Sequence, residues 1–299
     1  SYSVTGVQTC ALPIWFTYPE FDKTIFSHVP AEHLHEHTSS VGWKSDRENV
    51  SRLLNFIETR DKNSPFMTFL FFESPHARYY FPPECEIRKD YLKEFNYVTA
   101  DIQQDIGLIF NRYINSCNHL DTQYARVIDY LEEKGLLDTT IVIITGDHGE
   151  EFMEHGRWGH NSAFVEEQVK TPLVIWVPGM EPAEYTKMTS HLDIPATMMR
   201  VLGVENPPSD FSLGMDMFSD EQRQFTVFSD WNSLVYMDSE CKIILPLKVS
   251  ASFETLNEVT TADDKRVADA SAVFSKKIDA LVRVLHESSK FTKIHLDKR

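Results

Sequence analysis

The chain has 299 residues, of which 42% are hydrophobic and 25% are charged, so it can bury a core and is not disordered by composition. Its 29 Lys and Arg stand against 45 Asp and Glu, a formal net charge of −16. A surface this acidic repels phosphate backbones and excludes nucleic acid as a main partner, and no apolar run is long enough to predict a membrane-spanning helix.

The first fourteen residues, SYSVTGVQTCALPI, resemble a translated sequencing adaptor. We therefore leave residues 1–14 out of the expected fold as a non-native segment. On this interpretation the native gene begins upstream, and the amino-terminal part of the domain is missing from the chain.

The first predicted elements are a helix, a strand and a second helix. Residues 46–60 place apolar side chains at helical spacing behind Asp46, which predicts an amphipathic helix. The continuous apolar run 66–72 predicts a strand that is buried on both faces, and Pro75 ends it. An apolar stripe predicts a long helix over 111–134, directly before a glycine that can terminate it.

The pattern then alternates between strand and helix. Residues 140–145 and 172–177 predict two further buried strands, and a helix is expected from Ile194 to Leu202 with Asp193 as its N-cap. Because strands alternate with helices at this spacing, we predict an α/β sandwich with a mostly parallel central sheet.

The carboxyl-terminal part has a different pattern. Short strands separated by turn residues between 225 and 247 predict a small antiparallel meander. Apolar residues at helical spacing over 274–285 predict a final helix that packs on its own domain. We therefore expect a main domain over 15–220 and a carboxyl-terminal subdomain over 221–299.

Candidate functional residues follow two predicted strands at their carboxyl ends, where open α/β sheets bind ligands. These are His76 and the pair Asp147 and His148. A carboxylate beside a neutral imidazole suits Zn²⁺ or Mn²⁺, so the pair is a candidate for metal ligation. Two neighbouring glycines are expected to let the backbone turn sharply here. His160 lies twelve residues after His148, in a glycine-containing loop that can fold back over the site.

Two arginines near these residues, Arg78 and Arg157, could bind an anionic substrate bidentately. Simpler explanations remain open for every candidate. Arginines in exposed loops are common without a ligand, Asp147 could cap the next helix, and the histidines could be surface residues.

The motifs together are more specific than any one of them. They resemble the sulfatase-type domain of the alkaline phosphatase superfamily, over about residues 45–220. Their order is most similar to that of membrane-anchored members, namely YejM-type inner-membrane proteins, lipoteichoic acid synthases and phosphoethanolamine transferases. The motifs are TGDHGEE at 145–151, GHNS at 159–162, PLVIWVPG at 172–179 and HLDIPAT at 191–197.

The resemblance implies roles for individual residues. Asp147 and His148 would bind the principal divalent metal, which could be Zn, Mn, Mg or Ca. His160 and His76 would bind a second metal or the phosphate of the substrate, with histidine handling the leaving-group proton. Glu150 matches a neighbouring acidic residue that supports a ligand.

The resemblance also implies a metal-activated Thr, Ser or formylglycine nucleophile that attacks phosphorus or sulfur. In the family this nucleophile and an acidic metal ligand belong to the first strand-and-loop unit. The present sequence has no C-x-P-x-R motif. We therefore expect the chain to carry half of the metal site and to lack its nucleophile.

The function that this implies is a metal-dependent hydrolase or transferase for phosphate or sulfate esters, with a lipid headgroup as one form of the substrate. The family context implies an extracytoplasmic, periplasmic domain that upstream helices tether to the membrane and that is soluble as a fragment. The alternative is a catalytically inactive sulfatase fold that serves as a lipid-binding or regulatory domain of an inner-membrane protein. A cytoplasmic phosphomutase relative with two manganese ions is disfavoured, because no basic sugar-phosphate loop is present.

Overall fold

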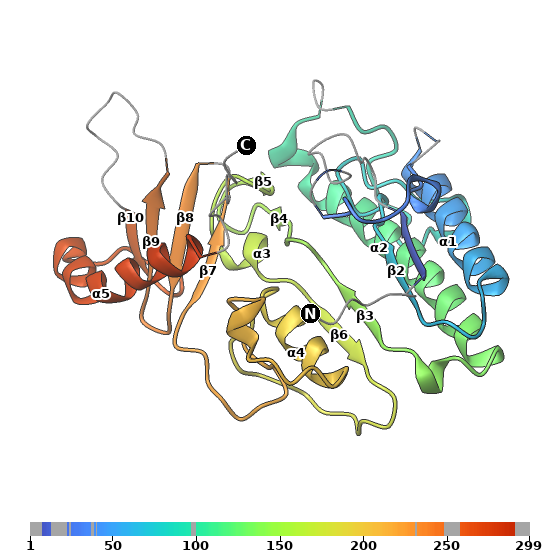
Figure 1. The fold of residues 1–299 in the computed structure, drawn as a ribbon. Coiled ribbons are helices and arrows are strands. Elements are labelled where there is room, and N and C mark those ends of the chain that lie inside the picture. Colours follow the sequence, from blue (N-terminus) through green and yellow to red (C-terminus); the bar gives the residue numbers. More distant parts are fainter. Residues whose placement is uncertain are drawn as a thin grey trace, which may run out of the picture. The chain divides into compact units, whose positions relative to one another are not determined.

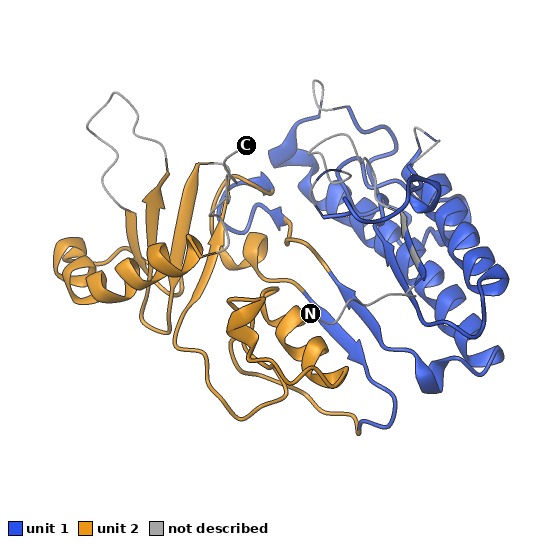
Figure 2. Ribbon diagram, viewed as in Figure 1, with its two compact units in different colours: residues 1–145, 151–159, 172–180 blue, residues 146–150, 160–171, 181–299 orange. Residues whose placement is uncertain are grey.

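The computed structural model describes most of the chain, in two compact units that Figure 2 shows in different colours. The sequence-based domain boundaries, 15–220 and 221–299, remain a prediction. The described residues are 8–12, 23, 25–36, 39, 41–96, 100–230, 232–247 and 258–290. Unit 1 comprises residues 1–145, 151–159 and 172–180, and unit 2 comprises residues 146–150, 160–171 and 181–299.

Two long helices of unit 1, α1 (Gly42–Thr59) and α2 (Ile102–Glu133), pack side by side, and α1 also packs on strand β2 (Phe66–Leu70) (Figure 1). Leu53 and Ile57 of α1 are buried in one core cluster. The second helix begins well before residue 111, where the sequence predicts its start. The carboxylate of Asp101 accepts a hydrogen bond from the N–H of Gln104 at 3.2 Å and caps the helix there.

The first strand pair of unit 1 contains residues that the sequence analysis leaves out of the fold. Residues Gln8–Leu12 form β1, which pairs in parallel with β2, so that Gln8 lies opposite Phe66. Cys10 is buried in the core cluster that also contains Leu53. The segment therefore contributes a strand, and its non-native origin remains a prediction.

The strands β3 (Val142–Thr145) and β6 (Leu173–Trp176) pair antiparallel, with Val142 opposite Trp176. This pair departs from the mostly parallel sheet that the alternation of strands and helices predicts. A parallel pair needs a crossover connection, which is usually a helix. Here the connection holds only the hairpin of β4 (Glu151–Phe152) and β5 (Trp158–Gly159) and the four-residue helix α3 (Glu166–Val169).

Unit 2 contains the antiparallel meander and the final helix that the sequence predicts. Helix α5 (Ala270–Ser288) covers one face of the four-stranded sheet (Figure 1). Lys277 of α5 contacts the carboxylates of Asp238 at 2.8 Å and Glu240 at 2.7 Å. The strand order is β10-β9-β8-β7, from β7 (Thr226–Ser229), β8 (Ser233–Met237), β9 (Cys241–Pro246) and β10 (Glu258–Thr261).

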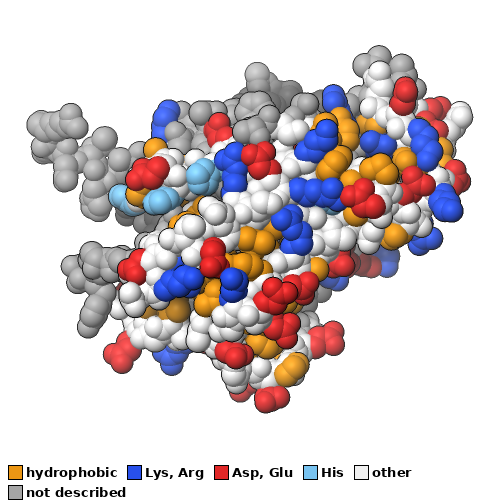
Figure 3. All heavy atoms as spheres, turned by 90° about the vertical axis from the view of Figure 1, so that its right-hand side faces the viewer, with side chains coloured by type: hydrophobic (Ala, Val, Ile, Leu, Met, Phe, Trp, Pro, Cys, Tyr) orange, Lys and Arg blue, Asp and Glu red, His pale blue; other side chains and the backbone are white. Residues whose placement is uncertain are grey.

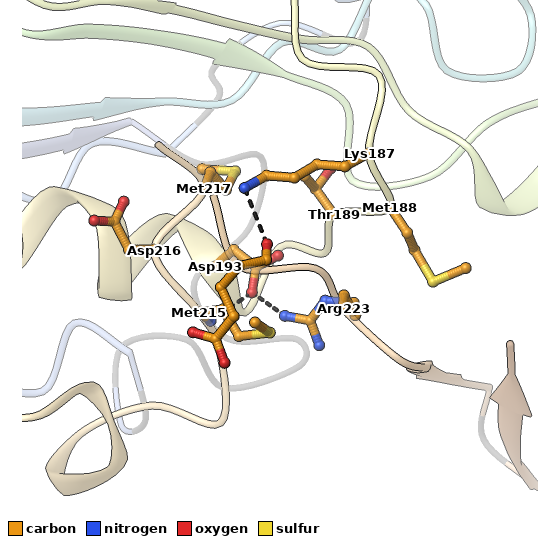
Figure 4. Close-up of a pocket in the computed structure, with 9 residues that line it drawn as sticks. Lys187, Met188, Thr189, Asp193, Met215, Asp216, Met217 and Arg223 are labelled. Carbon is orange, nitrogen blue, oxygen red and sulfur yellow. Dashed lines mark hydrogen bonds and ion pairs between the residues drawn. The ribbon is translucent and has the colours of Figure 1, made fainter. Parts of the chain in front are cut away.

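Helix α4 (Asp193–Val201) begins one residue earlier than predicted, and its expected N-cap has another role. The buried carboxylate of Asp193 accepts hydrogen bonds from the N–H of Ser190 at 2.8 Å and of Met215 at 2.7 Å, and it pairs with Arg223. Figure 4 shows this ion pair in a small pocket with Lys187, which donates to the backbone carbonyl of Glu221 at 3.2 Å. Asp193 therefore ties together the segments around α4 and does not cap the helix.

The remaining helices are short 3-10 turns, and none of the helices in the described ranges combines the length and apolar composition that a bilayer crossing needs. On the face seen in Figure 3, basic and acidic side chains are interspersed, so the net negative charge is not a uniform acidic surface. The 3-10 turns are η1 (Ala31–His33), η2 (Pro83–Cys85), η3 (Leu137–Thr139) and η4 (Pro208–Asp210).

Candidate functional site

Asp147 and His148 directly follow β3 and begin the candidate site in unit 2. Nδ1 of His148 lies 2.8 Å from the carbonyl oxygen of Gly149. Because a carbonyl only accepts, Nδ1 carries the proton and the lone pair of Nε2 is left for a metal. Nε2 lies 3.6 Å from Oδ2 of Asp147, close to the separation of about 3.3 Å expected between two ligands of one tetrahedral zinc ion.

Gly149 is required by a close backbone contact. A Cβ atom at this position would lie 2.1 Å from the carbonyl oxygen of Glu167, and the N–H of Gly149 donates to the carbonyl of Gln168 at 2.9 Å. The backbone bends at Asp147 and His148 as expected, but neither Gly146 nor Gly149 has a positive φ, so no left-handed conformation requires glycine here. The absence of a side chain instead lets the α3 segment pack against the backbone beside His148.

His160 and Glu150 complete the group. Nδ1 of His160 lies 2.6 Å from Oε2 of Glu150, whose side chain is only 9% exposed. The hydrogen bond to this carboxylate raises the pKa of His160. The rings of His148 and His160 lie 3.9 Å apart. The ligand atoms of His148, Glu150 and His160 all lie within 4.8 Å of one another, so the structure brings together three predicted site residues that could hold a metal ion.

The predicted residues His76, Arg78 and Arg157 belong to unit 1. His76 lies in the loop after β2, with Nδ1 3.9 Å from Oε1 of Glu73, and its side chain is half exposed. Arg78 is exposed in the same loop and donates to the hydroxyl of Tyr80 at 3.2 Å. Arg157 lies in the β4–β5 hairpin. That these side chains join His148 and His160 at one site remains a prediction.

His191 and Glu151, which belong to the motifs at 191–197 and 145–151, bind backbone groups near the candidate site, and the sequence pattern did not predict these roles. Nε2 of His191 lies 2.8 Å from the carbonyl oxygen of Gly146, next to Asp147, and 3.3 Å from the hydroxyl of Thr171. The fully buried Glu151 accepts hydrogen bonds from the N–H groups of His155 at 3.0 Å and Arg157 at 2.9 Å, and so shapes the hairpin. The only sequence feature that could have indicated these two residues is that both lie within the family motifs.

Comparison with known proteins gives matches at the level of both family and fold. The family model described as Sulfatase matches residues 6–204. The inner membrane protein YejM of Salmonella typhimurium is 30% identical over 137 residues, which cover 45% of this chain and 23% of YejM. The chain thus spans about a quarter of that relative.

Three solved structures share the fold at low sequence identity. The structure of BT4656 in complex with its substrate D-glucosamine-2-N,6-O-disulfate has a TM-score of 0.66 and 16% identity, and covers 95% of this chain and 80% of its own. The lipoteichoic acid synthase LtaP from Listeria monocytogenes has a TM-score of 0.63 and 17% identity, over 98% and 72%. A protein in the alkaline phosphatase superfamily from Vibrio parahaemolyticus has a TM-score of 0.57 and 17% identity, over 95% and 66%.

Proposed function

Since the chain belongs to the sulfatase family of the alkaline phosphatase superfamily, we propose that it is part of a metal-dependent hydrolase or transferase that acts on phosphate or sulfate esters. The observation that carries this proposal is the group of His148, Glu150 and His160, whose ligand atoms lie within 4.8 Å of one another. The group lies at the carboxyl end of a strand, where folds of this class bind ligands.

The donor atoms fit a divalent cation. His148 offers Nε2 because Nδ1 is engaged with a carbonyl, and Oδ2 of Asp147 lies 3.6 Å away. Imidazole nitrogen and carboxylate oxygen suit Zn²⁺ and Mn²⁺, and Mg²⁺ and Ca²⁺ remain alternatives. When bound, the ion would act as a Lewis acid toward the oxygens of the ester.

With Asp147 and His148 holding the ion, Glu150 and His160 would move a proton, and the remaining residues would bind the substrate. Glu150 holds the Nδ1 proton of His160, so His160 can donate a proton from Nε2 to a leaving group. We assign His76 to the same task or to the ester oxygens. The exposed guanidinium groups of Arg78 and Arg157 are suited to the anionic ester group, because a guanidinium binds two such oxygens at once.

The relatives support the sulfate-ester class and a membrane context. BT4656 is described with a sulfated sugar as its substrate, and YejM is an inner membrane protein. We therefore propose that the chain belongs to an extracytoplasmic, periplasmic domain of a membrane protein, and that a lipid headgroup is one form of its substrate. The alternative function is that of a catalytically inactive sulfatase fold, a lipid-binding or regulatory domain of an inner-membrane protein, which the resemblance to YejM-type proteins allows.

Calorimetric titration of Mn²⁺ and Zn²⁺ into the 299-residue chain tests the metal site. We expect Asp147→Ala and His148→Ala each to weaken binding by more than about ten-fold, since each removes a ligand. Asp138→Ala and His286→Ala change exposed residues of the same types outside the group and should bind as the parent does. Unchanged affinity in both ligand variants would overturn the site.

Hydrolysis of p-nitrophenyl phosphate and p-nitrophenyl sulfate separates the two functions. Because the sequence has no C-x-P-x-R motif, we expect no turnover above background from this chain alone. Turnover that Asp147→Ala abolishes would contradict that expectation and would show that the chain is itself an enzyme. Metal binding without turnover in the intact native protein would favour the binding domain.

A further inference from the structure

The loop that carries His76 and Arg78 has a strained backbone. Arg78 has a φ of +86° and Tyr79 a φ of +46°, although neither is a glycine. The Cβ atom makes this left-handed region unfavourable. Two such residues in a row persist only where the surrounding structure holds them, and such strain clusters at functional sites.

The start of the loop is held by a buried carboxylate. Asp46 of α1 is completely buried, and its Oδ1 accepts the N–H of Glu73 at 2.8 Å. Its Oδ2 accepts the N–H of Ser74 at 3.0 Å and also the hydroxyl of Ser74. Asp46 therefore fixes the chain just before His76.

The end of the loop is held by a buried guanidinium. Arg112 of α2 is 8% exposed, and its Nε donates to the carbonyl oxygen of Arg78 at 2.6 Å. Its Nη1 donates to the carbonyls of Leu92 at 2.9 Å and Lys93 at 3.3 Å. Burial of a charged group is costly, and in the described part of the chain the hydrogen bonds of this cation all go to backbone carbonyls. A buried arginine that binds only backbone carbonyls is expected where the protein must hold a segment of backbone in one conformation.

Tyr79 fixes the direction of the loop between these anchors. Its ring is completely buried and packs on Phe95, Tyr113, Phe152 and Trp158, with ring centroids 5.5 to 6.4 Å apart. Tyr79 and its neighbours therefore differ in environment: the side chain of Tyr79 is buried, whereas those of Arg78 and His76 are exposed.

We propose that Asp46 and Arg112 are positioning residues that hold the loop 73–79 in its strained conformation and thereby present His76 and Arg78, already oriented, to an anionic ester group. The inference rests on the proposed function for the role of the two presented side chains. The two charges act at opposite ends of the loop, a carboxylate on N–H groups and a guanidinium on a carbonyl, which matches the polarity of each backbone group. Preorganisation of this kind avoids the loss of loop freedom on binding.

Amide hydrogen exchange of the 299-residue chain tests the positioning itself. The N–H of Tyr79 donates to the carbonyl of His76 at 2.9 Å, so its protection reports the loop. We expect Arg112→Met to accelerate exchange in residues 73–80 by about ten-fold or more, the effect of losing a charged hydrogen bond, while residues 233–247 are unaffected. Arg88→Met, at an exposed arginine, is the control. Equal exchange in Arg112→Met and the parent would overturn the inference.

A double-mutant cycle covers the case in which Arg112→Met is poorly folded. Arg78→Gly adopts a positive φ without strain, so in the parent it should raise the thermal midpoint by about 2–4 °C. In the milder Arg112→Lys background the loop is already relaxed, and the gain should shrink or vanish. Equal gains in both backgrounds would show that Arg112 does not hold the strain.

Binding of inorganic sulfate, measured by calorimetry with Mn²⁺ present and at fixed ionic strength, tests the purpose of the positioning. We expect Arg78→Gln to lose sulfate binding and Arg112→Met to weaken it about ten-fold, while the affinity of Arg112→Lys lies between those of Arg112→Met and the parent. Faster exchange with unchanged sulfate affinity would overturn the functional role of Arg112. A parent chain that binds no sulfate would instead overturn the proposed role of Arg78 as an anion ligand, and the exchange result would still decide whether Arg112 holds the loop.

Discussion

The carboxylate of Glu150 lies 2.6 Å from Nδ1 of His160, and both side chains are largely withdrawn from solvent. This contact determines which nitrogen of His160 carries its proton and leaves Nε2 facing outward from the pair. The two residues are ten positions apart in the sequence, and they act as one unit with respect to protonation.

Glu150→Gln is expected to lower the pKa of His160, because the carboxylate hydrogen bond is the largest cause of its raised pKa. The raised pKa of His160 also determines how the stability of the fold depends on pH. The contact stabilises the fold fully below the unfolded pKa of about 6.5 and loses this contribution as pH rises through the folded pKa. NMR titration of the His160 ring gives the pKa directly. Glu154→Gln, the same charge change six residues before His160 in the sequence, should leave it in place, and an unshifted pKa in Glu150→Gln would refute the assignment.

His191→Ala is expected to weaken metal binding by about ten-fold, since residues that orient ligands typically contribute this much. The imidazole holds the carbonyl of Gly146, next to the candidate ligand Asp147. His191→Asn keeps a donor and should recover part of the affinity. Calorimetry with Mn²⁺ makes the comparison, with His286→Ala on α5 as the control. Equal affinities in all three variants would show that His191 has no part in orienting the ligands.

Gly149→Ala is expected to destabilise the chain by about 1–3 kcal/mol, because backbone must move to admit a methyl group. The new Cβ would lie 2.1 Å from the carbonyl oxygen of Glu167. Gly107→Ala is the matched control, as its Cβ meets nothing within 4 Å and it lies inside α2; it should stabilise by about 1 kcal/mol. Urea unfolding measures both. A neutral Gly149→Ala would mean that α3 can shift away at no cost.

Lys277→Met is expected to lower stability at neutral pH by about 2 kcal/mol and to flatten its acid dependence. Burial alone would raise the pKa of Asp238, but hydrogen bonds from Lys277 and Tyr236 outweigh it and lower the pKa to about 2. A lowered carboxyl pKa adds stability that is present above the unfolded value of about 3.9 and is lost as pH falls toward 2. Urea unfolding between pH 7 and pH 2 tests this, with the exposed neighbour Lys276→Met as the control. A parallel loss of stability in both variants on acidification would count against the ion pair.

Local pattern was enough to predict the elements that bury one face. The apolar stripe of α1 and the meander against α5 are both present, since spacing along the chain decides which face of such an element is apolar. The antiparallel pairing of β3 with β6 was not predictable in the same way, because the direction of β6 depends on a connection with no crossover helix.

The candidate site divides similarly. A chemically distinctive side chain at a strand end pointed to His148, a glycine-containing loop pointed to His160, and the structure places the two together. His191 and Glu151 were missed because each binds backbone groups. Such contacts depend on where the fold places a donor or acceptor, and they produce no periodic pattern in the sequence. The cap predicted at Asp193 failed because its carboxylate finds Arg223, thirty residues away, in place of its own helix.

The path of the chain between the two units limits how the candidate metal group can be prepared in isolation. Within residues 145–181 the chain changes unit five times, so His148 and Glu150 are separated from the rest of unit 2 by the β4–β5 hairpin and by β6. Removal of residues 181–299 would delete most of unit 2, the unit that contains His148, Glu150 and His160. No single proteolytic cut separates the two units, because each consists of several segments of the chain. A shorter polypeptide that retains the group must therefore run from before β3 to the end of α5, and it carries the hairpin and β6 of unit 1 with it.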